Sequence, residues 1–182
     1  MKLYVLAAAA LLAATPTQAG VITVAGSHAG SCYDAAQART PTQQALAVCN
    51  EALTTQALSQ DDRLATHVNR GILLMLSERQ SLALADYHAA MAIDPRHPEP
   101  YLNKSVLIFD GDGSNQEAAQ LAEKALQLGT KRPGIALYVL ALAKEDAGDV
   151  ESAYRDLVRS AALEPKWDLP RQQLQRYRAK QR

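Results

Sequence analysis

The sequence predicts an all-α fold in which antiparallel helix hairpins stack side by side. Small residues recur at intervals of about 35, apolar residues recur at helical spacing within each interval, and proline or glycine stands where a helix would end. A fixed period of roughly 20 to 50 residues indicates a repeat architecture, in which each hairpin buries its apolar face against the next. The recurring positions are Ala83, Ala118 and Ala153; Ala90, Ala125 and Ser160; Gly71, Ser105 and Ala141; and Pro95 and Pro165.

Each repeat is predicted to contain two amphipathic helices. The apolar spacing that indicates them is seen at Val68, Ile72 and Met75, and again at Tyr154, Leu157 and Ala161. Small residues let the two helices approach closely, because the side chains at that contact are no larger than a methyl group. Helix boundaries are predicted at Thr40-Pro41 with Gln43 (a start), Ser114 with Glu117 (a capping box), Gly129 (an end), Gly148-Asp149 (a turn with an N-cap) and Pro165 (an end).

Two of the repeats resemble units of the tetratricopeptide repeat (TPR) family. The residues that carry the resemblance are Asn69-Arg70-Gly71, Ala83, Tyr87, Ala90 and Asp94-Pro95 in one unit, and Ala141, Gly148-Asp149, Ala153, Leu157, Ser160 and Glu164-Pro165 in the other. The middle unit fits at Asn103-Lys104-Ser105 but departs from the pattern elsewhere. An insertion lies between Phe109 and Asn115, and Thr130 stands where proline is expected.

The resemblance implies a right-handed superhelical stack of antiparallel hairpins, an α-solenoid, closed by a C-terminal capping helix. The whole chain is similar to small exported TPR proteins of Gram-negative bacteria, a group without a generally assigned biochemical role. One domain, residues 20–182, is expected to follow a signal peptide at 1–19. Its parts are 20–41 (a lead and a short helix from Ser31 to Arg39), 42–59 (a degenerate half repeat), 64–97 (a repeat), 98–132 (a looser repeat), 133–166 (a repeat) and 167–182 (the capping helix, with Trp167, Leu174 and Tyr177).

The N-terminal residues predict export. Lys2, an apolar run from Leu3 to Ala14 and a stretch of small and polar residues up to Ala19 have the layout of a secretory signal peptide. The alternative is a permanent membrane anchor, for which a run of about 12 residues is short, because a spanning helix needs roughly 20. Cleavage near Ala19 would release the protein into the periplasm or the medium. A lipid anchor is disfavoured because the first cysteine lies too far beyond the apolar run.

The two cysteines, Cys32 and Cys49, are predicted to form one structural disulfide. The alternative is two buried free thiols. A loop of this size would stabilise the fold by roughly 3 kcal/mol on the chain-entropy model.

No motif points to catalysis, a metal or a cofactor. The chain holds 19 basic and 19 acidic residues, so it lacks the excess positive charge that nucleic-acid binding requires. The segment Asp110 to Ser114 begins like a calcium loop, but Asn115 and Leu121 stand where glycine and glutamate are needed. No pair of histidines has the spacing of a helical metal site among His28, His67, His88 and His97.

The resemblance places the ligand-binding face on the first helix of each unit, which lines the concave groove of a TPR stack. The carboxylate clamp of chaperone-binding TPR domains is absent, because Val68, Leu102 and Tyr138 occupy the places of its lysines. The expected groove is therefore mainly apolar and suits an amphipathic helix or an extended apolar segment. Its expected contact residues are Val68, Asn69, Ile72 and Met75; Leu102, Asn103, Val106 and Phe109; and Tyr138, Leu142 and Glu145.

The leading functional hypothesis is a non-catalytic module that binds an unidentified peptide or protein segment in this groove. One alternative is a homo-oligomer in which the groove closes on a second copy, and another is that the N-terminal segment covers it. A third is an unrecognised cell-envelope enzyme, which a pocket joining His67 or His88 to an acidic residue and a Ser or Cys would support. The basic residues of the last helix are interpreted as a solvated face rather than a membrane contact, namely Arg171, Arg176, Arg178, Lys180 and Arg182.

Overall fold

The computed structural model describes residues 27–111 and 114–180, and this part of the chain is all-helical. The expected signal peptide, 1–19, and the lead from 20 to 26 lie outside it. Within it are nine α-helices and no strand: α1 (His28–Gln37), α2 (Gln43–Thr55), α3 (Gln60–Leu76), α4 (Gln80–Ile93), α5 (Pro98–Asp110), α6 (Asn115–Gln127), α7 (Pro133–Asp146), α8 (Val150–Leu163) and α9 (Leu169–Lys180). The expectation of an all-α chain is confirmed.

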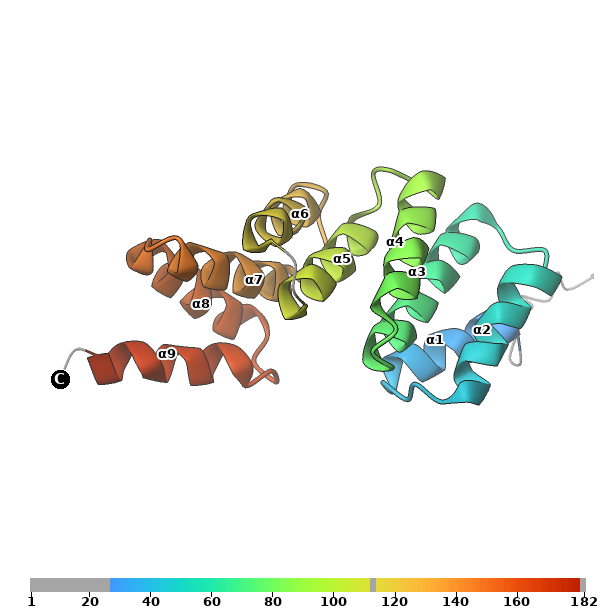
Figure 1. The fold of residues 1–182 in the computed structure, drawn as a ribbon, viewed down its shortest axis with the longest axis horizontal. Helices are drawn as coiled ribbons and strands as arrows, with labels where there is room; N and C mark the ends of the chain where they lie inside the picture. Colours follow the sequence, from blue (N-terminus) through green and yellow to red (C-terminus); the bar gives the residue numbers. More distant parts are fainter. Residues whose placement is uncertain (1–26, 112–113, 181–182) are drawn as a thin grey trace, which may run out of the picture.

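The helices follow one another along the long axis of the molecule, from α1 and α2 at one end to α9 at the other (Figure 1). Sequential helices pack as the pairs α1 with α2, α3 with α4, α5 with α6, and α7 with α8, and α6 also packs extensively on α7. Each first helix also contacts the next one, so that α1, α3, α5 and α7 form a continuous layer. Among the described residues no comparable packing joins α2 to α4, α4 to α6 or α6 to α8. The second helices α2, α4, α6 and α8 therefore lie apart from one another.

The N-terminal pair is joined by the predicted disulfide. Cys32 of α1 and Cys49 of α2 are bonded, fully buried, and surrounded by apolar side chains of α2, α3 and α4. The short helix begins at His28, three residues before the predicted Ser31, because the Ser27 hydroxyl accepts a hydrogen bond from the Gly30 amide and caps it.

Two other helix starts differ from the prediction. Thr42 rather than Thr40 is the N-cap of α2, and its hydroxyl accepts a hydrogen bond from the Ala45 amide, so Pro41 lies outside the helix. Helix α3 begins at Gln60, before the predicted repeat boundary at 64, because Ser59 caps it and its first turn carries two aspartates.

The predicted turns of the last two hairpins are confirmed. Ser114 caps α6 through the Glu117 amide, and Asp149 caps α8 through the Ser152 amide. Gly129 and Gly148 follow α6 and α7 with φ of 82° and 85°, the left-handed conformation that glycine adopts without strain. The residue of α3–α4 that corresponds to Gly148, 70 positions earlier, is Glu78, and it adopts φ 59°.

Thr130 stands where proline is expected at the α6–α7 junction, and hydrogen bonds hold the chain there in place of the proline ring. Its hydroxyl, which is buried, donates to Glu99 Oε1 over 2.9 Å, and the same carboxylate oxygen accepts from the Lys131 amide. The loop is therefore tied to the start of α5 by hydrogen bonds. The insertion between Phe109 and Asn115 includes residues 112 and 113, which lie outside the described part.

Small residues sit where the helices of a hairpin meet, as predicted. A Cβ atom built on Gly71 of α3 would lie 2.5 Å from Cε1 of Tyr87 on α4, a separation that real Cβ atoms do not show. The Tyr87 ring is fully buried against this glycine. The close approach of α3 and α4 therefore requires a residue without a side chain at position 71.

Helix α9 covers the last hairpin. Tyr177 is buried in a cluster with Ala141, Ala153 and Leu157, and Leu174 packs against the same cluster. Trp167, in the segment before α9, contacts Tyr138 of α7 edge to face with ring centroids 4.8 Å apart. None of the helices in the described part is long and apolar enough to cross a bilayer.

Candidate functional site

The first helices present one continuous face, because α5 contacts both α3 and α7. Of the residues expected to bind a partner, Val68 and Leu102 belong to the core, with 6% and 3% of their surface exposed. The other nine are half-buried: Asn69, Ile72 and Met75 on α3; Asn103, Val106 and Phe109 on α5; and Tyr138, Leu142 and Glu145 on α7. These nine side chains are the members of the expected set that keep part of their surface exposed.

The apolar members of this set rest on the core and leave part of their surface uncovered. Ile72 packs against the cluster of Leu64, Val68 and Ala90, and Met75 packs against the cluster around the disulfide. Val106 and Phe109 pack against the cluster shared by α5, α6 and α7. The core holds these side chains in position from one side. The apolar surface that a ligand would contact is therefore preorganised.

The polar members are partly engaged within the chain. The Asn103 amide nitrogen donates to the Glu99 carbonyl over 2.9 Å. Glu145 accepts from Arg176 of α9 at 3.2 Å, and Tyr138 lies against Trp167. At the third unit, α9 and the segment before it therefore occupy part of the face, and the parts on α3 and α5 are the more open ones.

A buried carboxylate organises the α3–α4 hairpin. Asp86 of α4 is 3% exposed and accepts two hydrogen bonds from Arg70 of α3, Nε to Oδ2 at 2.8 Å and Nη2 to Oδ1 at 2.6 Å. His67 Nδ1 lies 2.8 Å from the same Oδ1. An ionised carboxylate can only accept, so Nδ1 of His67 carries the proton. Arg70 Nη1 also donates to Asn50 of α2 at 2.7 Å, which links this hairpin to the preceding pair.

The environment of Asp86 favours its ionised form. Burial raises the pKa of the carboxyl, but the hydrogen bonds and positive charges of Arg70 and His67 together outweigh burial, and the pKa lies below its ordinary value. Asp86 is therefore a carboxylate at neutral pH, and its charge is compensated within the hairpin.

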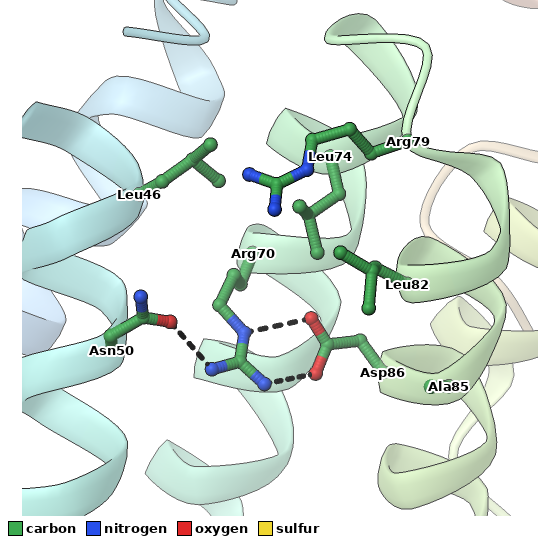
Figure 2. A pocket seen from close by; sticks show the side chains of 8 residues that line it. All are labelled: Leu46, Asn50, Arg70, Leu74, Arg79, Leu82, Ala85 and Asp86. Atoms are coloured by element: carbon green, nitrogen blue, oxygen red, sulfur yellow. Dashed lines mark hydrogen bonds and ion pairs between the residues drawn. The ribbon is translucent and has the colours of Figure 1, made fainter. Parts of the chain in front are cut away.

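This ion pair lies in a hollow between α2 and α4, over α3 (Figure 2). The hollow has a volume of about 260 Å³. Figure 2 shows Arg70 reaching from α3 toward both Asp86 and Asn50. The lining residues are Leu46, Asn50, Arg70, Leu74, Arg79, Leu82, Ala85 and Asp86. None of them belongs to the predicted partner-binding set, so this hollow is a separate feature from the first-helix face.

His67 and Asp86 together form the acid–histidine pair that the enzyme hypothesis required. That hypothesis also required a serine or cysteine in the same pocket, and the lining of the hollow contains neither these residues nor His67. His88 is exposed on α4, His97 is the N-cap of α5, and His28 lies 3.3 Å from Glu51. Within the described residues, no group of three or more His, Cys, Asp and Glu could hold a metal ion.

An ion pair between the first and second helix recurs in every hairpin from α3 onward, which the sequence reasoning missed. Lys104 of α5 lies 3.2 Å from Glu117 of α6, and Lys144 of α7 lies 2.6 Å from Asp156 of α8. Asp156 corresponds to Asp86, 70 residues earlier, and it is also buried. The signal in the sequence was an aspartate three residues after the recurring alanine in two of the units.

No protein-family model matches this sequence, and comparison with curated proteins finds no match either.

Proposed function

We propose that the protein is an exported, non-catalytic protein-binding module of the TPR type. The observation that carries the proposal is a row of half-exposed apolar side chains on three adjacent first helices, namely Ile72, Met75, Val106, Phe109 and Leu142. The proposed ligand is an amphipathic helix or an extended apolar segment of another protein, which this row would contact along its length.

Two features support the superhelical arrangement as part of the proposal. First helices contact one another in succession, whereas second helices are held apart. A stack with contacts on one side and spaces on the other curves toward the contacts, and the first-helix face would then be the concave one. The recurring small residues and the glycine turns agree with the TPR pattern.

Export is the second part of the proposal. The disulfide between Cys32 and Cys49 supports it, because structural disulfides persist in oxidising compartments such as the periplasm. The predicted signal peptide agrees with this location.

The test is site-specific photo-crosslinking in exporting cells. A crosslinking amino acid at Met75 or Phe109 is expected to give an adduct with one other protein, identified by mass spectrometry. The matched control is Glu123, an exposed residue on the second helix α6, where no such adduct is expected. Adducts only with the protein's own chain would replace the proposal with the homo-oligomer, and equal adducts at Glu123 would remove it.

A further inference from the structure

Helix α4 begins with an arginine where the later second helices begin with a capping side chain. Arg79 is the N-cap of α4, and its side chain makes no capping hydrogen bond. The residues 35 and 70 positions later are Ser114 and Asp149, and each accepts a hydrogen bond at the start of its helix. Arg79 lacks this hydrogen bond and places a positive charge at the helix end where the dipole disfavours it. The stability of the hairpin therefore does not explain this arginine.

The side chain of Arg79 lines the hollow between α2 and α4. Figure 2 shows it reaching from the start of α4 toward Leu46 of α2. No side chain in the described part of the molecule forms a hydrogen bond or an ion pair with it. Its neighbour in the chain, Glu78, is exposed and does not belong to the lining. Arg79 therefore brings to the hollow a positive charge that the described residues do not compensate.

The other polar side chains of the hollow are engaged with one another. Arg70 donates to both carboxylate oxygens of Asp86 and to Oδ1 of Asn50. Each side-chain acceptor of the lining therefore already accepts a hydrogen bond. The guanidinium of Arg79 and Nδ2 of Asn50 are donors that have no acceptor among the described residues. Donors without acceptors, together with an uncompensated positive charge, favour an anionic ligand in this hollow.

The rest of the lining is apolar, and part of it departs from the pattern of the repeats. Four residues make up this part, Leu46, Leu74, Leu82 and Ala85. Leu82 is 47% exposed. The positions of Leu82 and Ala85 are occupied by polar residues in the later second helices, by Glu117 and Gln120 in α6 and by Ser152 and Arg155 in α8. The apolar surface beside Arg79 is thus specific to α4, and it suits the hydrocarbon part of a ligand.

The size and the hydrogen-bonding pattern of the hollow decide which ligand fits. Its volume of about 260 Å³ lies below the roughly 300–1,000 Å³ of sites for drug-sized molecules, so the ligand is short. A carboxylate only accepts hydrogen bonds and can accept two from one guanidinium. The C-terminus of a peptide would also bring an amide donor, for which the lining side chains offer no unengaged acceptor.

We propose that the hollow binds a carboxylate with a short, unbranched hydrocarbon chain. The carboxylate is held by Arg79, and the chain covers Leu46, Leu74 and Leu82. This site is separate from the first-helix face, so the two can be tested independently.

The probe for this proposal is octanoate, titrated into the purified, oxidised protein. Binding is followed by NMR of the leucine methyl groups. Saturable shifts are expected at Leu46, Leu74 and Leu82, whereas Leu140 of α7 is expected not to change.

The decisive variant is Arg79→Ser, which gives α4 the capping residue of α6. It is expected to weaken octanoate binding at least tenfold without lowering the thermal unfolding temperature, because serine can cap the helix. The matched control is Arg96→Ser, which removes an exposed arginine beyond the other end of α4 and is expected to leave the affinity unchanged. Equal affinity of the Arg79→Ser variant and the natural chain would overturn the proposal.

A second variant and two other ligands test the apolar wall and the charge. Leu82→Glu gives α4 the residue of α6 at this place and is expected to weaken octanoate binding at least tenfold. Octanol and octylamine are each expected to bind at least tenfold more weakly than octanoate. Equal binding of octanol would remove the requirement for an anion, and the proposal would be wrong.

Three further results would overturn the proposal. Loss of octanoate binding in Met75→Gln, with binding retained in Arg79→Ser, would place the ligand on the first-helix face. Shifts of all leucine methyl groups without saturation would show non-specific association. An acetylated peptide that ends in leucine with a free carboxylate, and that binds at least tenfold more tightly than octanoate, would make a protein C-terminus the occupant.

Discussion

Arg70 and Asp86 form a two-point ion pair across the α3–α4 hairpin, and Arg70 extends it to Asn50 on the preceding helix pair. The carboxylate is buried, while the guanidinium is about one quarter exposed. Removal of either partner leaves the other without its compensating charge, which costs more than the loss of a surface pair.

Asp86→Ala is expected to lower the free energy of unfolding by about 2–3 kcal/mol, measured by urea denaturation. This loss is at the lower end of, or below, the loss usual for breaking a fully buried ion pair, because the Arg70 side chain can turn partly to solvent. The matched control is Glu151→Ala, which breaks the exposed pair with Arg155 on α8 and is expected to change stability by less than about 0.5 kcal/mol. Equal effects of the two substitutions would contradict the role given to Asp86.

The same carboxylate makes stability depend on acid pH. Its folded pKa lies below the unfolded value of about 3.9, so its contribution is fully present above pH 4 and is lost as the pH falls through the folded pKa. As the pH is lowered below about 4, the urea concentration at the unfolding midpoint is expected to decrease. The decrease should be less steep for Asp86→Asn than for the natural chain. Parallel pH profiles of the two proteins would show that other carboxyl groups carry the acid sensitivity.

Gly71→Ala is expected to destabilise the protein by about 1–3 kcal/mol, because the added methyl group meets the buried Tyr87 ring. The third unit suggests the rescue, since Ala141 and Leu157 occupy the corresponding positions. The double variant Gly71→Ala with Tyr87→Leu should therefore lose less stability than the sum of its single variants. A thermal denaturation cycle measures the coupling, and strict additivity would rule out the proposed steric conflict.

Glu78→Gly is expected to stabilise the protein by about 0.5–1 kcal/mol. Glu78 adopts a left-handed conformation that disfavours a residue with a side chain, at the place where the α7–α8 turn has Gly148. The reciprocal change, Gly148→Ala, should destabilise by a similar amount. Urea denaturation of both variants checks the signs, and a stabilising Gly148→Ala would refute the strain argument.

Reduction of the Cys32–Cys49 disulfide is expected to lower the free energy of unfolding by about 3 kcal/mol. Within the described residues α1 packs mainly on α2 and α3, so its amide protons should exchange faster after reduction while those of α7 and α8 do not change. Faster exchange across all helices would instead show that the disulfide supports the whole stack.

The helices could be predicted from the sequence because their signals are local. Ser114, Gly129 and Gly148 each determine one boundary through their own backbone or side-chain geometry, and the structure confirms them. The start of α2 was predicted two residues early because Thr40 and Thr42 are both possible caps. In the structure the Thr40 hydroxyl donates to the Ala35 carbonyl of α1 instead, and Thr42 caps α2. The alanine and glycine period predicted which faces meet, because close packing of helices restricts residue size.

The hollow and the ion pairs could not be predicted in this way. Arg70, Asp86 and Asn50 come from three helices, and their meeting depends on the rotation of each helix about its axis. Lys144 reaches Asp156 from a position one helical turn beyond the place that corresponds to Arg70, so the pairs do not follow the repeat period strictly.

Because the first helices are in contact and the second helices lie apart, the molecule is expected to bend more easily in one direction than in the other. Bending that spreads α2 from α4 separates two helices without extensive packing on each other, whereas spreading α3 from α5 separates two helices that are in contact. The stack is thus expected to change its curvature by moving the second helices apart while the first helices stay in contact. The proposed binding face could then adjust to ligands of different length. Spin labels on α2 and α4 should show a broader distance distribution than labels on α3 and α5.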